Sequence, residues 1–313
     1  MTPTTSRILS HVGELSGFHD LLGEAGADVD IVPVPPEGQV DVDGEVLLTL
    51  AQGTPNLPEV LRSGVRWVHT VGTGIDTFPM QHLGERPLTV SRGATSVAIA
   101  EWVMAQILTA EKRLPESWVS EPPAQWGGPE LGGLQGRTIA ILGFGTVGTA
   151  LATRALAFDS KVVALRRSDA PSPVPGVTMV RSIPELLADA DHVILAAPLT
   201  ESTRGVVDSA FLSAMKPGAH LINVARSGLV VEDDLRRALD EGRPALASID
   251  VAPVEPLPAG HWLYTHPRVR FSPHASWSGL GVWESILTSF ADNYRRWVAG
   301  EPLHNVVDPV HGY

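Results

Sequence analysis

The chain contains no cysteine. This absence excludes disulfide bonds, a catalytic thiol and thiolate-bound metal ions. Long apolar runs are also missing: the longest, Val97–Ala110, contains Glu101 and is shorter than the roughly 20 residues that span a bilayer. The first residues, MTPTTSR, lack the apolar segment that follows the basic start of a secretory signal. These absences predict a cytoplasmic protein with no membrane partner.

Positive charge is scarce as well. The sequence has 23 lysines and arginines against 35 aspartates and glutamates, a formal net charge of -12. Nucleic acids require a basic face, so this balance disfavours a nucleic-acid partner. An anionic ligand would need a local positive site, because the overall field repels it. The length of 313 residues, of which 43% are hydrophobic, is enough for two domains with separate cores.

Glycine is abundant by contrast, and it forms one pattern with chemical meaning. The segment 139–148, IAILGFGTVG, begins with a short apolar run that predicts a buried strand, and helix-forming residues follow it. Gly143, Gly145 and Gly148 stand between them in G-x-G-x-x-G spacing. Gly143 allows a tight turn, Gly145 lets the backbone approach a pyrophosphate, and Gly148 lets the helix pack on the strand. The exposed amides at the helix N-terminus then face the dianionic group, so the segment predicts dinucleotide binding.

Strand and helix signals alternate along most of the chain. In the first hundred residues the predicted strands are 7–12, 29–34, 45–50, 66–71 and 88–90, and the predicted helices are 18–25 and 57–62. Later strands are predicted at 138–142, 161–165, 192–196, 219–223 and 245–250, with helices at 146–157, 183–188, 208–214 and 231–241. Two longer helices are predicted at 96–113, with Ser96 as a candidate N-cap, and at 279–299. Such alternation implies parallel sheets covered by helices.

The turn after the strand 161–165 bears on the choice of dinucleotide. A carboxylate there usually binds the ribose 2′-OH of NAD, but this turn begins with Arg166, Arg167 and Ser168 before it reaches Asp169. Two guanidinium groups and a hydroxyl suit a 2′-phosphate through charge-assisted hydrogen bonds. The pattern therefore favours NADP. Asp169 leaves NAD open, and a solvated basic turn without a ligand is the alternative.

Three residues with catalytic chemistry follow predicted strands in the second half of the chain. They are Arg226, Glu255 and His274. The carboxyl ends of strands form the edge at which open α/β sheets bind ligands. A histidinium can donate a proton near neutral pH, and a paired carboxylate favours its charged form. A guanidinium fits a carboxylate beside a carbonyl and stabilises charge that develops on oxygen.

Six segments in order resemble the D-isomer specific 2-hydroxyacid dehydrogenase family. They are TVGTGIDTF at 70–78, SRGATSVAIAEW at 91–102, PLTESTRGVV at 198–207, INVARSGLVVEDDLRRAL at 222–239, SIDVAPVEPLP at 248–258 and SPHASW at 272–277. The resemblance covers most of the chain. It implies an oxidoreductase of the glyoxylate and hydroxypyruvate reductase type, which reduces a small 2-keto acid to the (R)-2-hydroxy acid.

The same resemblance implies a role for each matching residue. Arg226 matches the arginine that binds the substrate carboxylate and carbonyl, His274 the acid/base histidine, and Glu255 its acidic partner. The other expected substrate-binding residues are Thr73 and Gly74, through their backbone amides, and Trp277, which would shape specificity. The expected cofactor-binding residues are Gly143, Gly145, Thr146, Val147, Gly148, Arg166, Arg167, Ser168, Pro198, Thr203, Ala225 and Asp250, the last beside the nicotinamide carboxamide.

The predicted fold is α/β, with two doubly wound parallel-sheet domains. The long helices at 96–113 and 279–299 bracket the glycine-containing half, which predicts that one domain is inserted into the other. We expect a Rossmann dinucleotide-binding domain at 101–282 and a flavodoxin-like substrate domain at 1–100 and 283–313. The resemblance also implies a homodimer.

Some residues depart from the family pattern or have a plainer interpretation. Ser227 stands where the family usually has glycine, and Arg92 stands where many members have a small or amide residue. Arg92 is interpreted equally well as a second substrate contact or as a salt-bridge residue. Trp118 and Trp126 lie in a connecting segment and suit dimer packing or substrate contact. The remaining histidines that we considered are interpreted as surface or packed residues, without metal-ligand spacing, so no metal is expected: His69, His82, His192, His261, His266 and His304.

Two alternative functions stay open at this point. A phosphite-type dehydrogenase is compatible with the same three residues. A cofactor-sensing binding protein on the same fold could retain them without turnover. A formate dehydrogenase is disfavoured, because such enzymes have glutamine where Glu255 stands.

Overall fold

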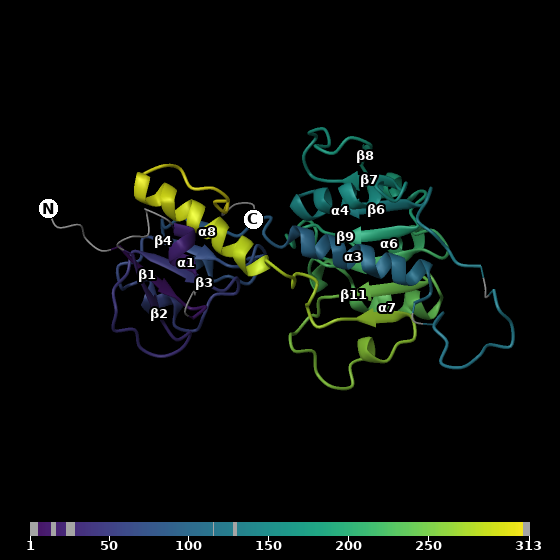
Figure 1. The fold of residues 1–313 in the computed structure, drawn as a ribbon, viewed down its shortest axis with the longest axis horizontal. Coiled ribbons are helices and arrows are strands. Elements are labelled where there is room, and N and C mark those ends of the chain that lie inside the picture. Colours follow the sequence, from purple (N-terminus) through teal and green to yellow (C-terminus); the bar gives the residue numbers. More distant parts are fainter. Residues whose placement is uncertain (1–5, 14–16, 23–28, 115, 128–129, 309–313) are drawn as a thin grey trace. The chain divides into compact units, whose positions relative to one another are not determined.

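The computed structural model describes residues 6–308 apart from 14–16, 23–28, 115 and 128–129. The chain divides into two compact units (Figure 1). The first unit comprises residues 1–95 and 280–313, and the second comprises residues 96–279. Each unit is built on a parallel sheet with helices, which confirms the predicted α/β fold class.

The first unit contains a five-stranded sheet with the order β2-β1-β3-β4-β5. Its strands are β1 (Ser6–Ser10), β2 (Val29–Pro33), β3 (Val46–Thr49), β4 (Trp67–Thr70) and β5 (Leu88–Val90). Its helices are α1 (Phe18–Leu22), α2 (Leu57–Val60), the short 3-10 helix η2 (Met80–His82) and α8 (Val282–Ala299). The C-terminal α8 packs on this sheet: Phe290 stacks on Phe18, with ring centroids 5.2 Å apart, and contacts the buried Trp67.

The second unit contains a seven-stranded parallel sheet with the order β12-β11-β10-β9-β6-β7-β8. Its strands are β6 (Thr138–Leu142), β7 (Lys161–Leu165), β8 (Val177–Val180), β9 (His192–Leu195), β10 (His220–Asn223), β11 (Leu246–Ile249) and β12 (Val269–Phe271). Its helices are α3 (Ser96–Glu111), α4 (Thr146–Leu156), α5 (Ile183–Leu187), α6 (Ser209–Ala214) and α7 (Glu232–Asp240), with the 3-10 turns η3 (Ser227–Leu229) and η4 (Trp262–Tyr264).

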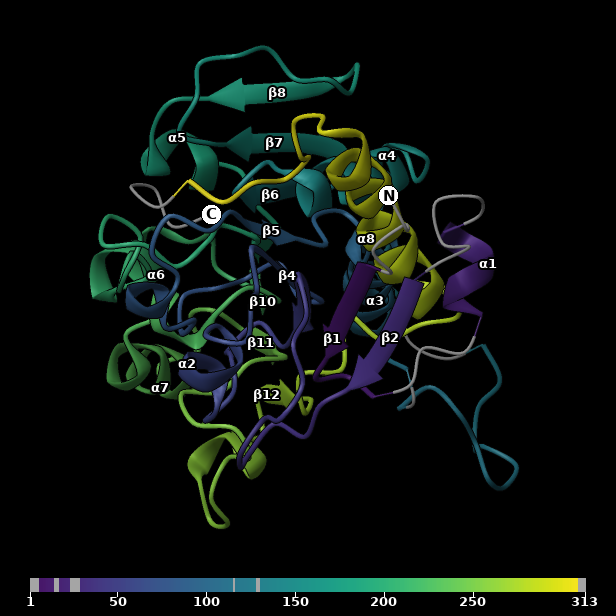
Figure 2. The same ribbon diagram turned by 90° about the vertical axis from the view of Figure 1, so that its left-hand side faces the viewer.

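Helices cover both faces of the second sheet. One core cluster joins α5, α6 and α7 to the sheet, and the other joins α3 and α4 to the opposite face (Figure 2). Strands buried on both sides are mostly apolar, and all five residues of β6 are buried. The strand order reverses at β6, which pairs with β7 on one side and with β9 on the other. The carboxyl end of β6 is therefore the topological switch point, where such sheets bind ligands.

The predicted strands and helices are found within a few residues of their expected ends. The structure adds β8 and β12, which were not predicted. The prediction of Ser96 as an N-cap is wrong. Ser96 is itself the first helical residue of α3, and its buried hydroxyl makes no hydrogen bond among the described residues, whereas a cap must precede the first helical residue. The end of the predicted helix 18–25 lies outside the described residues.

No helix in the described part of the chain is both long enough and apolar enough to cross a bilayer.

Candidate active site

The three glycines that follow β6 each meet a distinct local requirement. Gly143 has a φ of 97°, and a Cβ there would lie 2.3 Å from the backbone nitrogen of Ala197. At Gly148 a Cβ would lie 2.8 Å from the carbonyl oxygen of Gly143, so glycine lets α4 approach the strand. A Cβ at Gly145, the N-cap of α4, would meet no protein atom within 4 Å. The space beside Gly145 and the first amides of α4, at Thr146 and Val147, fits a pyrophosphate.

The turn after β7 carries the residues expected near the ribose. The Arg166 guanidinium donates to the carbonyl oxygens of Ala170 (2.6 Å) and Pro171 (2.9 Å), so it holds the turn in shape. Arg167 and Ser168 are exposed beside it. The carboxylate of Asp169 forms an ion pair with Arg181. The turn thus presents positive charge, and its first carboxylate is already paired.

The loop after β9 holds two further residues expected at the cofactor. The Thr203 hydroxyl donates to the carbonyl oxygen of Pro198 at 2.7 Å and accepts from the amide of Thr200 at 2.8 Å. Pro198 and Thr203 therefore belong to one turn at the carboxyl end of β9. Strand β9 pairs with β6, the strand that leads into the glycine loop.

His274 and Glu255 contact each other directly. Nδ1 of His274 lies 2.8 Å from Oε2 of Glu255, and the other carboxylate oxygen, Oε1, accepts from the amide of Ala252 at 3.0 Å. Burial raises the pKa of Glu255, but the Ala252 amide, the His274 hydrogen bond and the charges of His274 and Arg226 together bring it below its usual value. The carboxylate is therefore ionised near neutral pH and accepts the Nδ1 proton, which leaves Nε2 of His274 for a substrate.

The backbone of His274 adopts a conformation that few side chains accept. Its φ is 53°, in the left-handed region, and its amide bonds the carbonyl oxygen of Ser272 at 3.0 Å. Asp250, fully buried at the end of β11, holds this loop. Its Oδ1 accepts from the Ser272 hydroxyl (2.5 Å) and the Ala275 amide (2.9 Å), and its Oδ2 accepts from the Ser276 amide (2.9 Å). Asp250 thus positions His274, and its role beside the nicotinamide stays a prediction.

Arg226 lies in the loop that follows β10. Its extended backbone precedes η3, and its Nη1 donates to the carbonyl oxygen of Ala225 at 2.8 Å. The buried Asn223 shapes this loop: its Oδ1 accepts from the Ala225 amide at 3.0 Å, and its Nδ2 donates to the Arg226 carbonyl at 2.9 Å. Sequence reasoning missed Asn223, although a polar residue at the end of a buried apolar strand was a usable signal. Ser227 adopts no left-handed backbone conformation, so the loop accepts it in place of glycine.

These groups share one edge of the second sheet. The glycine loop, Arg226 and His274 follow the carboxyl ends of β6, β10 and β12, and Glu255 lies in the segment after β11. Trp277, half-buried, comes three residues after His274. Thr73 and Gly74 belong to the first unit, where they follow β4 and the Thr73 hydroxyl donates to the carbonyl oxygen of Ser91 at 3.3 Å.

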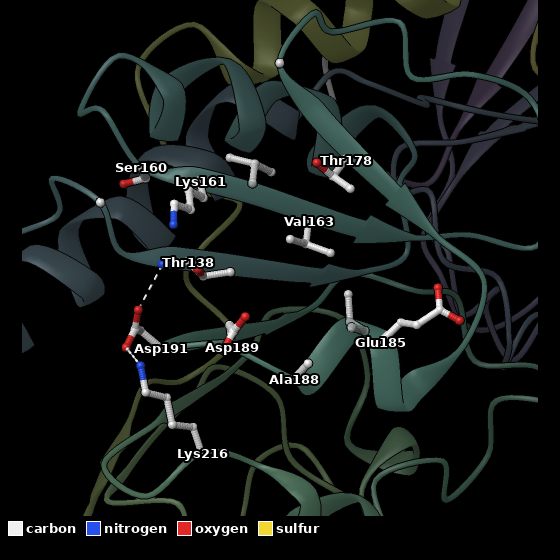
Figure 3. Close-up of a pocket in the computed structure, with 14 residues that line it drawn as sticks. Thr138, Ser160, Lys161, Val163, Thr178, Glu185, Ala188, Asp189, Asp191 and Lys216 are labelled. Carbon is white, nitrogen blue, oxygen red and sulfur yellow. Dashed lines mark hydrogen bonds and ion pairs between the residues drawn. The ribbon is translucent and has the colours of Figure 1, made fainter.

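A cavity of about 570 Å³ in the second unit lies at a different place (Figure 3). Its lining includes Thr138 and Lys161, the first residues of β6 and β7, so it belongs to the amino ends of the strands. The nearby Asp191 accepts from the Thr138 amide at 2.9 Å and from Lys216 at 2.7 Å. This cavity is therefore not part of the candidate active site.

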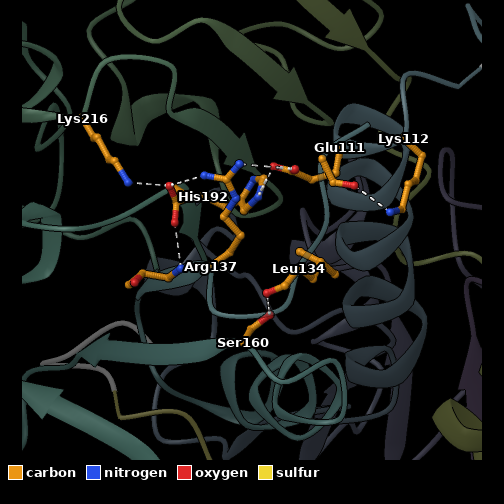
Figure 4. Close-up of polar contacts among 10 residues, drawn as sticks. Glu111, Lys112, Leu134, Arg137, Ser160, His192 and Lys216 are labelled. Atoms are coloured by element: carbon orange, nitrogen blue, oxygen red, sulfur yellow. Dashed lines mark hydrogen bonds and ion pairs between the residues drawn. The ribbon is translucent and has the colours of Figure 1, made fainter. Parts of the chain in front are cut away.

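A polar network beside this cavity gives the buried His192 a structural role. Glu111, at the end of α3, faces Nε2 of His192 at 3.2 Å and Arg137 at 3.8 Å (Figure 4). The contact with His192 is the main cause of the lowered pKa of Glu111. His192 therefore ties α3 to β9. Among the residues that the structure describes, no group of three or more histidines and carboxylates could hold a metal ion.

A doubly wound sheet with a glycine loop at its switch point, and an arginine, a glutamate and a histidine on the same edge, defines a nicotinamide-dinucleotide oxidoreductase. The family model of the D-isomer specific 2-hydroxyacid dehydrogenase NAD binding domain matches residues 104–276, more than half of the chain. The chain belongs to this family, as the sequence motifs predicted.

Individual relatives agree with this assignment. The chain is 30% identical over 264 residues to glyoxylate/hydroxypyruvate reductase A of Serratia proteamaculans, which covers 80% of this chain and 83% of that protein. It is 29% identical over 276 residues to D-3-phosphoglycerate dehydrogenase of Methanocaldococcus jannaschii, covering 85% of this chain and 52% of that protein. The chain thus spans about half the length of the latter enzyme.

The fold is also similar to a solved structure. A D-isomer specific 2-hydroxyacid dehydrogenase from Xanthobacter autotrophicus Py2, in complex with NADPH and MES, superposes with a TM-score of 0.83 at 26% sequence identity. The match covers 99% of this chain and 100% of that chain.

Proposed function

We propose that the protein reduces a small 2-keto acid, such as glyoxylate or hydroxypyruvate, to the (R)-2-hydroxy acid with NADPH or NADH. The observation that carries this proposal is the 2.8 Å contact between His274 and Glu255 on the sheet edge that also bears the glycine loop. The similarity to a glyoxylate/hydroxypyruvate reductase supports the substrate class.

The proposed chemistry divides among three side chains. A bound NADPH or NADH would supply the hydride that C2 of the keto acid accepts. His274 donates a proton from Nε2 to the carbonyl oxygen, while Glu255 keeps the imidazole oriented through its contact with Nδ1. Arg226 binds the carboxylate and stabilises the charge that develops on the carbonyl oxygen.

The first unit supplies the proposed substrate-binding loop. We assign residues 1–100 and 283–313 to a substrate domain and 101–282 to the dinucleotide domain. The backbone amides of Thr73 and Gly74 would bind the substrate carboxylate, and Trp277 would restrict the substituent at C3. We also propose that the protein is a cytoplasmic homodimer. Sedimentation of the purified protein would test the dimer.

NADP is the proposed preferred cofactor. The positive turn of Arg166, Arg167 and Ser168 supports this preference, as does the ion pair that engages Asp169. The relative from Xanthobacter autotrophicus was solved with NADPH, which is consistent with it. NAD remains the second cofactor to test.

The deciding experiment is a panel of 2-keto acids assayed with NADPH and NADH in parallel, with the chirality of the product determined. Turnover of glyoxylate or hydroxypyruvate to an (R)-hydroxy acid, where the product is chiral, is the expected result. Oxidation of phosphite with NADP⁺ or NAD⁺, without keto-acid reduction, would assign a different dehydrogenase. Tight NADPH binding without turnover of any member of the panel would instead indicate a cofactor-sensing protein.

A further inference from the structure

Asn223 is the last residue of β10, and its polar side chain is enclosed within the second unit. The residue is 1% exposed, and β10 lies between β9 and β11 in the sheet. A buried amide makes its hydrogen bonds within the protein. Oδ1 accepts from the amide of Ala225 at 3.0 Å, and Nδ2 donates to the carbonyl oxygen of Arg226 at 2.9 Å. Both ends of the side chain are therefore engaged by the loop that follows the strand.

These two hydrogen bonds hold the backbone of Arg226. That backbone is extended, with a φ of -145° and a ψ of 143°, and so lies in a broad allowed region. The torsional preference of Arg226 alone therefore does not select one position. Its carbonyl oxygen accepts from Asn223 and also from the amide of Leu229, at 3.3 Å. The loop is thus held between the end of β10 and the 3-10 turn η3.

The position of Arg226 matters because its charge reaches the proposed catalytic pair. Burial raises the pKa of Glu255, and the charges of His274 and Arg226 are among the causes that lower it. Arg226 therefore lies within electrostatic range of the carboxylate that contacts the proposed proton donor. Its Nη1 also donates to the carbonyl oxygen of Ala225 at 2.8 Å, so the guanidinium is linked to the backbone of its own loop. A shift of that backbone would move the guanidinium as well.

The backbone of Asn223 contacts the second loop of the site. Its carbonyl oxygen accepts from the Asp250 amide at 3.0 Å, and the Asp250 carboxylate holds the residues after His274. A substitution of the Asn223 side chain leaves this backbone hydrogen bond in place. Such a substitution should therefore act on the loop of Arg226 and spare the loop of His274.

We propose that Asn223 is a positioning residue, which holds Arg226 where its guanidinium binds the substrate carboxylate. This inference rests on the proposed function, which assigns that carboxylate to Arg226. Asparagine suits the task because one short side chain offers an acceptor and a donor, and the loop presents an amide and a carbonyl to match them. A misplacement of about 1 Å can cost a factor of about a hundred in rate, so the loss of this anchor is measurable.

The test is a double-mutant cycle between Asn223→Ala and Arg226→Ala. In the wild-type background, Asn223→Ala should lower kcat/KM for glyoxylate about tenfold to a hundredfold. In the Arg226→Ala background the same substitution should change kcat/KM less than about twofold, because no guanidinium remains to be positioned. A merely structural role predicts the same factor in both backgrounds, so the cycle separates the two roles.

A second readout covers the variants with slow turnover. Oxamate is an unreactive anion with a carboxylate beside a carbonyl, and its Kd for the protein saturated with NADPH should follow the same cycle. The matched control is Ser248→Ala. Ser248 is a fully buried residue of the neighbouring β11, and its hydroxyl lies 2.9 Å from Nε2 of His220 and 3.2 Å from Oε1 of Gln106. Neither contact involves the loop of Arg226, so the effect of Ser248→Ala should be equal in both backgrounds.

The possible failures are distinguishable. A wild-type protein that reduces no keto acid refutes the proposed function, and the assignment of Asn223 falls with it. An active wild-type protein in which Asn223→Ala has the same effect in both backgrounds overturns only the assignment of Asn223.

Circular dichroism and Tm check the fold of each variant. Asn223→Ser keeps a hydroxyl at this buried position, and it replaces Asn223→Ala in the cycle if the alanine variant does not fold. If neither variant folds, Asn223 is a requirement of the fold, and its assignment as a positioning residue is overturned.

Discussion

Asp250 accepts hydrogen bonds from both of the residues that follow His274. The amides of Ala275 and Ser276 each lie 2.9 Å from its carboxylate, which is fully buried at the end of β11. The left-handed φ of His274 is thereby fixed from one side, while Glu255 fixes the imidazole from the other. The position of the proposed proton donor thus depends on two carboxylates with different tasks.

Replacing Asp250 with asparagine should therefore reduce both stability and turnover. The amide cannot accept from three donors, so the free energy of unfolding should fall by about 1–3 kcal/mol. Turnover should fall about tenfold to a hundredfold, because the donor is displaced. Urea unfolding and steady-state rates measure the two effects. Asp189→Asn, a change at an exposed carboxylate of the same unit, is the control, and equal behaviour of the two variants would contradict the assigned role.

His274→Ala should lose more than about a hundredfold in kcat, the usual contribution of a general acid. The Kd for NADPH should change little, since the glycine loop and the basic turn are untouched. Stopped-flow or steady-state assays measure the rate, and fluorescence titration measures the Kd. The control is His304→Ala, which removes an exposed imidazole. His304 makes its hydrogen bonds to the Asn293 side chain through backbone atoms, so the substitution leaves them in place. Near-wild-type turnover in His274→Ala would remove His274 from the mechanism.

Glu255→Gln should change the dependence of stability on pH and should lower the rate. Folding lowers the pKa of Glu255 from its ordinary value of 4.5, so the carboxylate stabilises the protein above that value. The contribution is lost as the pH falls through the lowered pKa. The difference in Tm between wild type and variant should therefore be present at neutral pH and should vanish in acid. Because the carboxylate is partly exposed, salt should reduce the difference.

The rate should respond in the same variant. Glutamine carries no charge beside the imidazole of the proposed proton donor, so kcat for keto-acid reduction should fall. An unchanged kcat would remove Glu255 from the proposed mechanism.

Local sequence predicted every strand in the described part of the chain except β8 and β12, the two edge strands of the second sheet. The sequence of the buried strand β6, TIAIL, contains a short apolar run, and this run predicts a buried strand. The edge strand β12, VRF, has three half-buried residues with Arg270 in the middle, and β8 is equally mixed. Such short edge strands form because a neighbouring strand offers hydrogen bonds, and that neighbour is distant in the sequence.

The same division holds for the candidate site. The motifs predicted that Arg226, Glu255 and His274 follow strand ends, because strand ends can be read from hydrophobic runs. They could not predict that Glu255 also accepts from the Ala252 amide, or that Asp250 holds the loop of His274. Those contacts depend on loop conformations, including a left-handed histidine, which tertiary structure decides.

Arg167→Gln should reduce the preference for NADPH. Arg167 is exposed in the turn after β7, where a guanidinium suits the 2′-phosphate and not the 2′-OH. The KM for NADPH should rise about tenfold, and the KM for NADH should change much less. Steady-state assays with both cofactors measure the ratio, and NADH serves as the internal control. An equal rise for both cofactors would indicate that Arg167 supports the fold of the turn.

The glycines of the loop after β6 offer a paired test of fold against ligand binding. Alanine at position 143 would place its Cβ 2.3 Å from the backbone nitrogen of Ala197 at a φ of 97°, so Gly143→Ala should cost about 3 kcal/mol or more of stability. Alanine at position 145 meets no protein atom within 4 Å, and its φ of -98° suits any residue. Gly145→Ala should therefore cost less than about 1 kcal/mol.

The same small change at Gly145 should weaken the cofactor complex strongly, because a methyl group there fills the space that the pyrophosphate needs. We expect the Kd for NADPH to rise about tenfold or more, equivalent to about 1.4 kcal/mol of binding free energy. Thermal unfolding without cofactor measures the first effect, and fluorescence titration with NADPH measures the second. If Gly145→Ala is stable and binds NADPH as the wild type does, the pyrophosphate does not lie against this loop, and the cofactor site must be sought elsewhere.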